Sequence, residues 1–242
     1  MLDPKPRLLT FLDIAVAASV ALAACMVLLY APLEAVMGPV QRIFYFHLAS
    51  AWTGMLSFLV AALAGASYLR TSRLIWDIAS VSAVEIGMLF SLAAIASGSI
   101  WARPVWNTWW TWDPRLTTVT VMELIYAAYF LLRQGIGEPL RRARFAAVYA
   151  VVGFISVPMT FLSIRFLRTI HPVLIAGGDP SSVGAFDMSP RMLHTLLASL
   201  AAFSVLFADL LWHRIRLGRL ADLVSRRKQS LEEQEDPYGR SS

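Results

Sequence analysis

Tryptophan is concentrated in one short stretch of this chain, Trp101–Leu116, which reads WARPVWNTWWTWDPRL. An aromatic belt at a membrane surface needs only a few indoles spread over several helices, so it accounts poorly for such a run. A surface for a flat, apolar ligand or partner accounts for it better. Five of the eight tryptophans in the chain lie here: Trp101, Trp106, Trp109, Trp110 and Trp112. The second, third and fourth of these are spaced i, i+3 and i+4, and would share one face of a local helix.

Two of the four histidines, His47 and His171, lie in segments that could together bind a metal. His47 is in RIFYFHLASAW and His171 is in RTIHPVLI, where Pro172 favours extended backbone at the histidine. Either residue alone is better explained as an interfacial histidine hydrogen-bonded to backbone. As a pair beside a tryptophan-rich segment they are better explained as ligands, because neutral imidazole is the commonest metal ligand in proteins.

Coordination chemistry narrows the choice of metal. A structural zinc ion needs four protein ligands, and these histidines have no cysteine or carboxylate pair nearby. Two axial imidazoles suit haem iron, because the porphyrin supplies the other four ligands. A porphyrin is flat and apolar, and arginines can pair with its two propionates. The candidates for that pairing, some of which are equally explained as interfacial side chains, are Arg42, Arg103, Arg115, Arg165 and Arg168.

The single cysteine, Cys25, and the absence of a C-x-x-C-H motif exclude covalent haem attachment of the c type. Any haem is therefore expected to be a non-covalent haem b. Glu85 and Glu123 lie inside apolar segments, where an ionisable group is a functional candidate by default. A hydrogen-bonded contact between helices explains each of them equally well.

The composition points to a membrane protein that presents these residues on helices. The 242 residues are 57% hydrophobic and 15% charged, with a mean hydropathy of +0.60. We expect an all-α polytopic fold, since six segments approach the length of about 20 apolar residues that a span needs. These segments are Phe11–Tyr30, His47–Leu69, Ala79–Ile100, Thr117–Leu132, Phe145–Ile164 and Met192–Trp212.

The distribution of charge predicts the topology and argues against a nucleic-acid partner. Of 21 basic residues, 15 lie in the N-terminus, the 70–78 and 133–144 loops and the C-terminal tail. The positive-inside rule then places both termini in the cytoplasm. Three outer segments follow, and the tryptophan-rich one connects the third and fourth spans: Ala31–Phe46, Trp101–Leu116 and Arg165–Arg191.

Local signals predict where several helices begin and end. Pro104 is expected to end the third helix. Asp113-Pro114 and Ser189-Pro190 each predict an N-cap followed by the first helical residue. Gly38-Pro39 is expected to begin a short interfacial helix before the second span. Residues 1–212 form one predicted transmembrane domain. The tail, 213–242, is predicted to be a cytoplasmic amphipathic helix with a disordered end.

Trp101–Thr117, WARPVWNTWWTWDPRLT, resembles the WWD signature of the haem-handling proteins of cytochrome c biogenesis. Six spans and one histidine in each flanking outer segment are most similar to the CcmC family, and the two histidine contexts quoted above resemble those of that family. The likeness extends from Gln41 to about Leu200. The family pattern has glycine after Trp106, where this chain has Asn107. Asparagine tolerates left-handed backbone, so we expect the turn to survive.

The resemblance implies a haem-delivery protein of the bacterial inner membrane that carries out no enzymatic reaction. His47 and His171 would be the axial ligands, with haem held at the periplasmic face and passed to the haem chaperone CcmE. The implied partners are the ABC-type subunits CcmA and CcmB, the small protein CcmD and the lipid bilayer. The expected haem-binding residues are His47, His171, Trp101, Trp106, Trp109, Trp110, Trp112, Asp113, Arg42, Arg115 and Arg168.

Other functions remain possible from the residues alone. A b-type electron-transfer subunit would carry paired histidines deep in facing spans, and none lies there. A permease acting through Glu85 and Glu123 would need paired broken helices, for which Pro158 is one weak sign. A membrane hydrolase is disfavoured, because no nucleophile pattern and no H-E-x-x-H occurs.

Overall fold

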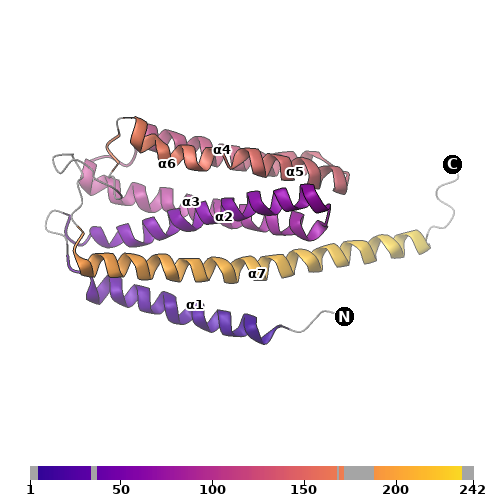
Figure 1. The fold of residues 1–242 in the computed structure, drawn as a ribbon, viewed down its shortest axis with the longest axis horizontal. Coiled ribbons are helices and arrows are strands. Elements are labelled where there is room, and N and C mark those ends of the chain that lie inside the picture. Colours follow the sequence, from indigo (N-terminus) through magenta and orange to yellow (C-terminus); the bar gives the residue numbers. More distant parts are fainter. Residues whose placement is uncertain (1–4, 34–36, 168, 172–187, 236–242) are drawn as a thin grey trace.

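The computed structural model describes residues 5–33, 37–167, 169–171 and 188–235. Within these residues, six helical spans are long and apolar enough to cross a membrane, which confirms the predicted all-α, multi-pass fold. Two spans are interrupted, the first by a change to π-helix and the fifth by a break into two helices (Figure 1). The elements are α1 (Arg7–Cys25) with η1 (Met26–Tyr30), α2 (Gln41–Thr71), α3 (Leu74–Trp106), α4 (Pro114–Gly135), α5 (Pro139–Gly153) with α6 (Ser156–Phe166), and α7 (Pro190–Glu235).

Successive spans run in opposite directions, so the connections gather at the two ends of the bundle (Figure 1). Residues 107–113, the start of α2, the end of α6 and the start of α7 lie at one end, which we call the tryptophan end. The α2–α3 and α4–α5 turns lie at the opposite end. The histidine and tryptophan segments therefore meet although they are far apart in the sequence.

The bundle is layered around α2 and α3, with α4, α5 and α6 on one side and α7 then α1 on the other (Figure 1). Small residues let α2 and α3 approach closely, as they do in membrane bundles generally. A Cβ atom added at Gly87 would lie 2.6 Å from the ring of Phe58, and one at Gly54 would lie 3.2 Å from the backbone nitrogen of Ser91. Phe58 also stacks on Tyr126 of α4, with ring centres 3.6 Å apart, and so joins the middle layer to the next.

The predicted starts of two helices are confirmed. Pro114 is the first residue of α4, and Oδ1 of Asp113 accepts a hydrogen bond from the backbone N–H of Leu116 at 2.9 Å. Pro190 begins α7, and the backbone nitrogen of Met192 lies 3.4 Å from the hydroxyl of Ser189.

Two local predictions are wrong. α3 does not end at Pro104 but continues to Trp106. Proline lacks the N–H that would bond to the carbonyl oxygen of Ile100 and crowds that carbonyl, and the helix ends two residues later, within the same turn. Gly38-Pro39 begins no separate helix. Gly38 adopts a left-handed φ of 56° in a turn, and the chain then enters α2 directly at Gln41.

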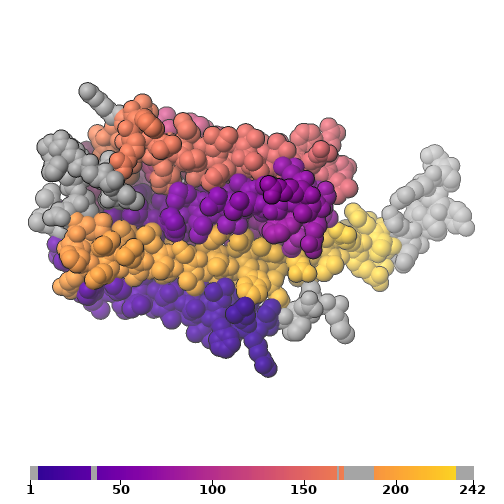
Figure 2. Space-filling view, viewed as in Figure 1, coloured from indigo at the N-terminus to yellow at the C-terminus, as the bar shows by residue number. Residues whose placement is uncertain are grey.

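The last helix continues past the predicted domain boundary. Residues 213–235 extend α7 without a break, and its final turns project beyond the rest of the bundle (Figure 2). Residues 236–242 lie outside the described residues. The division into residues 1–212 and 213–242 therefore stays a prediction.

Charged groups within the spans are mostly paired between helices. Arg133 donates to both oxygens of Asp77 at 2.6 and 3.0 Å, and Arg214 of α7 donates to Glu85 of α3 at 2.8 Å. Glu85 is thus an interhelical contact. Glu123 is buried, and its carboxylate has no hydrogen-bond partner among the described residues.

Candidate functional site

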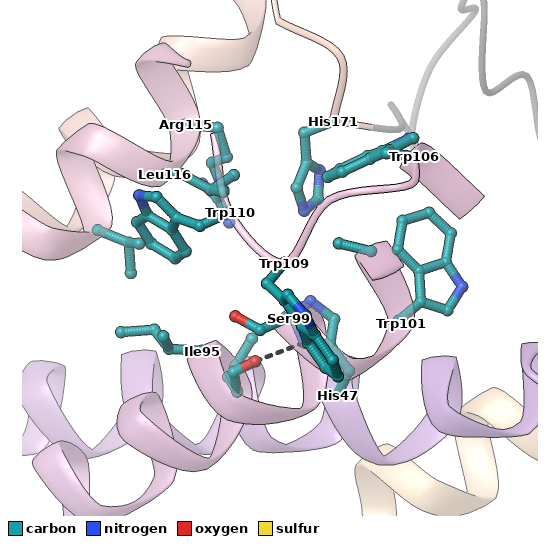
Figure 3. A pocket seen from close by; sticks show the side chains of 15 residues that line it. His47, Ile95, Ser99, Trp101, Trp106, Trp109, Trp110, Arg115, Leu116 and His171 are labelled. Carbon is teal, nitrogen blue, oxygen red and sulfur yellow. Dashed lines mark hydrogen bonds between the residues drawn. The ribbon is translucent and has the colours of Figure 1, made fainter. Parts of the chain in front are cut away.

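A cavity of about 90 Å³ lies at the tryptophan end, among α2, α3, α4, the 107–113 loop and His171 (Figure 3). Most of its walls are small or apolar side chains, such as Ala51, Ile95 and Val119. It brings together seven residues that the sequence singled out: His47, His171, Trp101, Trp106, Trp109, Trp110 and Arg115.

The two histidines face each other across this cavity although they come from separate segments. Their ring centres are 6.4 Å apart and the ring planes are inclined by 41°. His47 lies in the second turn of α2, and His171 lies beyond the end of α6. The predicted convergence of these residues at one end of the bundle therefore holds in the structure.

α3 fixes the ring of His47. The Nδ1 atom lies 2.8 Å from the carbonyl oxygen of Ala94, and a carbonyl can only accept, so Nδ1 carries the proton and donates. The Nε2 atom of the neutral ring is then left with its lone pair, the form that binds metals. The ring also packs against Gly98, where an added Cβ atom would lie 2.9 Å from Cε1.

The sequence analysis missed both Ala94 and Gly98. Their only signal was the stretch from Ala93 to Ser99 in the third span, in which every residue except Ile95 is small. Small residues in a membrane helix most often serve helix packing, so the run by itself did not indicate a histidine contact.

The tryptophans surround the cavity from two elements. Trp101 and Trp106 belong to α3 and pack edge to face, with ring centres 5.2 Å apart. Trp109 and Trp110 belong to the irregular loop, so the idea of one shared helical face is wrong, although both line the cavity with Trp106. Trp109 is 58% exposed and lies at the rim. Trp112 is 73% exposed, packs edge to face on Trp110 and does not line the cavity.

Asn107 makes the turn that directs the loop away from α3. It adopts a left-handed φ of 56°, which confirms that asparagine supports the turn here. Arg103 donates to the backbone oxygen of Asn107 at 3.0 Å and also to its side-chain oxygen. Arg103 therefore holds Asn107, the first residue after α3, against the last turn of that helix.

The other candidate arginines differ in whether they line the cavity. Arg115 lines the cavity, lies 4.4 Å from the ring centre of Phe161 and donates to the backbone oxygen of Thr160. Arg42 donates to the carbonyl oxygen of Leu28 at 3.0 Å and does not line the cavity. Arg168 lies outside the described residues.

Asp113 lies beside the cavity and does not line it. Besides capping α4 through Oδ1, it accepts a hydrogen bond at Oδ2 from the hydroxyl of Thr169. The Thr169 hydroxyl oxygen in turn accepts from the backbone N–H of His171 at 3.1 Å. The sequence analysis missed Thr169, since a threonine two residues before a histidine is not a recognisable motif.

Comparison with known proteins identifies the family. A family model described as Heme exporter protein C, CcmC, matches residues 3–233. A protein named Heme exporter protein C from Bradyrhizobium diazoefficiens is 33% identical over 183 residues, which are 74% of this chain and 67% of that protein. One from Escherichia coli K12 is 28% identical over 192 residues, which are 77% of this chain and 74% of that protein.

A ccmC-like mitochondrial protein of cytochrome c biosynthesis from Marchantia polymorpha is 30% identical over 159 residues, which are 66% of this chain and 64% of that protein. These matches to bacterial and organellar proteins agree with the family model, which extends over almost the whole chain. The chain belongs to the CcmC family.

Proposed function

We propose that this protein binds haem at the tryptophan end with His47 and His171 as axial ligands, and passes it to an acceptor during cytochrome c maturation. The observation that carries the proposal is the 6.4 Å between the two ring centres. An Fe–N bond is about 2 Å long and each nitrogen lies about 1 Å from its ring centre, so rings on opposite sides of one iron have centres about 6 Å apart.

The hydrogen bonding of His47 supports a role as a ligand. Its Nδ1 is occupied by Ala94, which leaves Nε2 as the coordinating atom. A backbone carbonyl in this position is a common way to orient a metal-binding imidazole. The haem would be held without a covalent bond of the c type, because the chain has one cysteine and no C-x-x-C-H motif, and we propose that it is haem b.

The size of the cavity supports a carrier. Its volume of about 90 Å³ is below the roughly 300 Å³ of the smallest pockets that enclose drug-sized ligands. A porphyrin between the histidines would extend past the rim at Trp109, with its faces against indoles. Arg115 is the described arginine best placed to meet a propionate, because it lines the same cavity. A cargo that stays partly exposed can be transferred without opening the bundle.

The names of the relatives guide the rest of the proposal. The name Heme exporter protein C suggests a part in a haem export system of the ABC type. From the resemblance of the tryptophan-rich motif we propose CcmA and CcmB as its ABC-type subunits, CcmD as a small partner and the haem chaperone CcmE as the acceptor. We place the tryptophan end on the periplasmic side of a bacterial inner membrane. The support is the basic residues at the opposite end, which include Arg70, Arg73 and Arg141. No enzymatic step is part of this proposal.

The alternatives receive less support from the geometry. A b-type electron-transfer subunit would hold haem between facing spans, whereas His47 and His171 meet at one end of the bundle. A permease acting through Glu85 is disfavoured because that carboxylate is paired with Arg214.

The test is the absorption spectrum of the detergent-purified protein beside His47→Ala and His171→Ala variants. His194→Ala is a matched control, because His194 lies near the start of α7, contacts Tyr30 at 3.3 Å and does not line the cavity. We expect a six-coordinate low-spin haem spectrum in the parent and the control, and altered ligation or haem loss in the other two. Unchanged spectra in His47→Ala and His171→Ala would overturn the ligand assignment.

A further inference from the structure

Two outer segments of the chain are joined at a single carboxylate. Oδ1 of Asp113 accepts from the backbone N–H of Leu116 at 2.9 Å and thereby caps α4. Oδ2 accepts from the hydroxyl of Thr169, whose oxygen accepts from the backbone N–H of His171 at 3.1 Å. A continuous series of hydrogen bonds thus runs from the start of α4 to the backbone of His171.

The surrounding structure gives this link a positional role. α6 ends at Phe166, and among the described residues its last backbone hydrogen bond is donated by Leu167 to Ser163 at 3.0 Å, so His171 lies beyond the helix. α4 is the better anchored of the two segments, because its first turn is fixed by a side-chain cap and by proline at its first position. The link therefore transmits the position of α4 to the segment that carries His171.

The chemistry of Asp113 argues against direct contact with a haem propionate. An ionised carboxylate only accepts hydrogen bonds, so it cannot bind an ionised propionate and would repel it. Both of its oxygens already accept from protein donors, and Asp113 does not line the cavity. Both oxygens of Asp113 therefore bind protein groups and not the haem.

We propose that Asp113 is a positioning residue that acts through Thr169 to hold His171 opposite His47. This inference rests on the proposed role of His171 as an axial ligand. It gives the aspartate of the tryptophan-rich motif a different function from that of the indoles: they contact the cargo, while Asp113 sets the place of a ligand.

The test compares three variants with the parent and with His171→Ala. Thr169→Val keeps the shape of the side chain and removes both hydrogen bonds, whereas Thr169→Ser keeps the hydroxyl. Asp113→Ser keeps an N-cap, since serine caps about as well as aspartate, but its side chain is one bond shorter and lacks the second oxygen that accepts from Thr169. The measurements are the haem spin state, the rate of haem loss to excess apomyoglobin, and recovery of the low-spin spectrum on adding free imidazole.

We expect Thr169→Val and Asp113→Ser to show a partly high-spin haem that is lost about ten-fold faster than in the parent, since each lacks a charge-assisted hydrogen bond. Added imidazole should restore the low-spin spectrum in both variants and in His171→Ala, because it fills the vacated coordination position. Thr169→Ser should match the parent. A general packing defect would not be repaired by imidazole.

The outcomes separate this inference from the proposed function. If Thr169→Val and Asp113→Ser both match the parent while His171→Ala loses its ligation, the link does not position His171 and the inference fails alone. If His171→Ala matches the parent, the ligand assignment fails and the inference fails with it. If Thr169→Val does not accumulate as folded protein, Asp113→Ser provides the test instead, because it removes the acceptor of the same hydrogen bond.

Discussion

The imidazole of His47 lies against the backbone of Gly98 so closely that a Cβ atom added at that glycine would be 2.9 Å from Cε1 of the ring. The same ring donates to the carbonyl oxygen of Ala94, one turn earlier on α3. A helix that contributes no ligand thus determines where a proposed ligand points.

Gly98→Ala is expected to disturb haem ligation without weakening the bundle. The added methyl group must displace the His47 ring from its bond with Ala94, whereas alanine is a better helix former than glycine by about 1 kcal/mol. We expect weaker haem retention and a shifted spectrum at an unchanged melting temperature. Gly137→Ala is the control, since a Cβ atom there meets nothing within 4 Å. A parent-like spectrum in Gly98→Ala would show that the ring can move freely.

Arg115 and Arg42 are expected to differ in their effect on haem. Arg115 lines the cavity, whereas Arg42 bonds to the carbonyl oxygen of Leu28. Arg115→Ala should therefore weaken binding by about 1.5–3 kcal/mol, the range for a hydrogen bond to a charged group, and Arg42→Ala should change it little. Measuring affinity with haem and with its dimethyl ester isolates the propionate, because the ester carries no charge there. An equal loss with both ligands would mean that Arg115 acts only through packing.

Substitutions at Asn107 are expected to rank by their tolerance of left-handed backbone. With φ at 56°, Asn107→Gly should be close to neutral, although it loses the bond from Arg103 to the side-chain oxygen. Asn107→Val should destabilise the protein by about 1–2 kcal/mol, because Cβ clashes in this conformation. Thermal unfolding in detergent measures the series. A valine variant as stable as the parent would mean that the turn rearranges at no cost.

Much of the architecture was predictable because membrane spans obey strong local rules. Apolar length alone placed all six spans, and the side chains of Asp113 and Ser189 marked helix starts that the structure confirms. The meeting of His47 and His171 followed from topology, since both segments had to emerge at the same end. Pro104 predicted the turn in which α3 ends but not its last residue, because proline disturbs the hydrogen bond to the residue four before it and does not fix where the following backbone leaves the helix.

The finer parts of the site depend on contacts between segments that have no sequence pattern. No motif in the sequence marks Thr169, Ala94 or Gly98. Their roles come from contacts made in the fold, Thr169 with the carboxylate of Asp113 and the other two with the ring of His47. Arg42 and Arg115 looked alike as outer arginines, and only the packing of α2 against η1 and of α4 against α6 separated them. The roles of these residues depend on which other residue each one meets in the folded chain, so the sequence of a single segment does not show them.

The two histidines also differ in how they are anchored, and this has a kinetic consequence. His47 is built into α2, so withdrawing it would require breaking helix contacts as well as its bond to Ala94. His171 lies in irregular backbone beyond α6, and its backbone N–H bonds to the hydroxyl of Thr169. If both histidines ligate haem, His171 can therefore be withdrawn without breaking a helix, whereas His47 cannot. We expect ligand exchange with an acceptor to be sequential and to begin at His171.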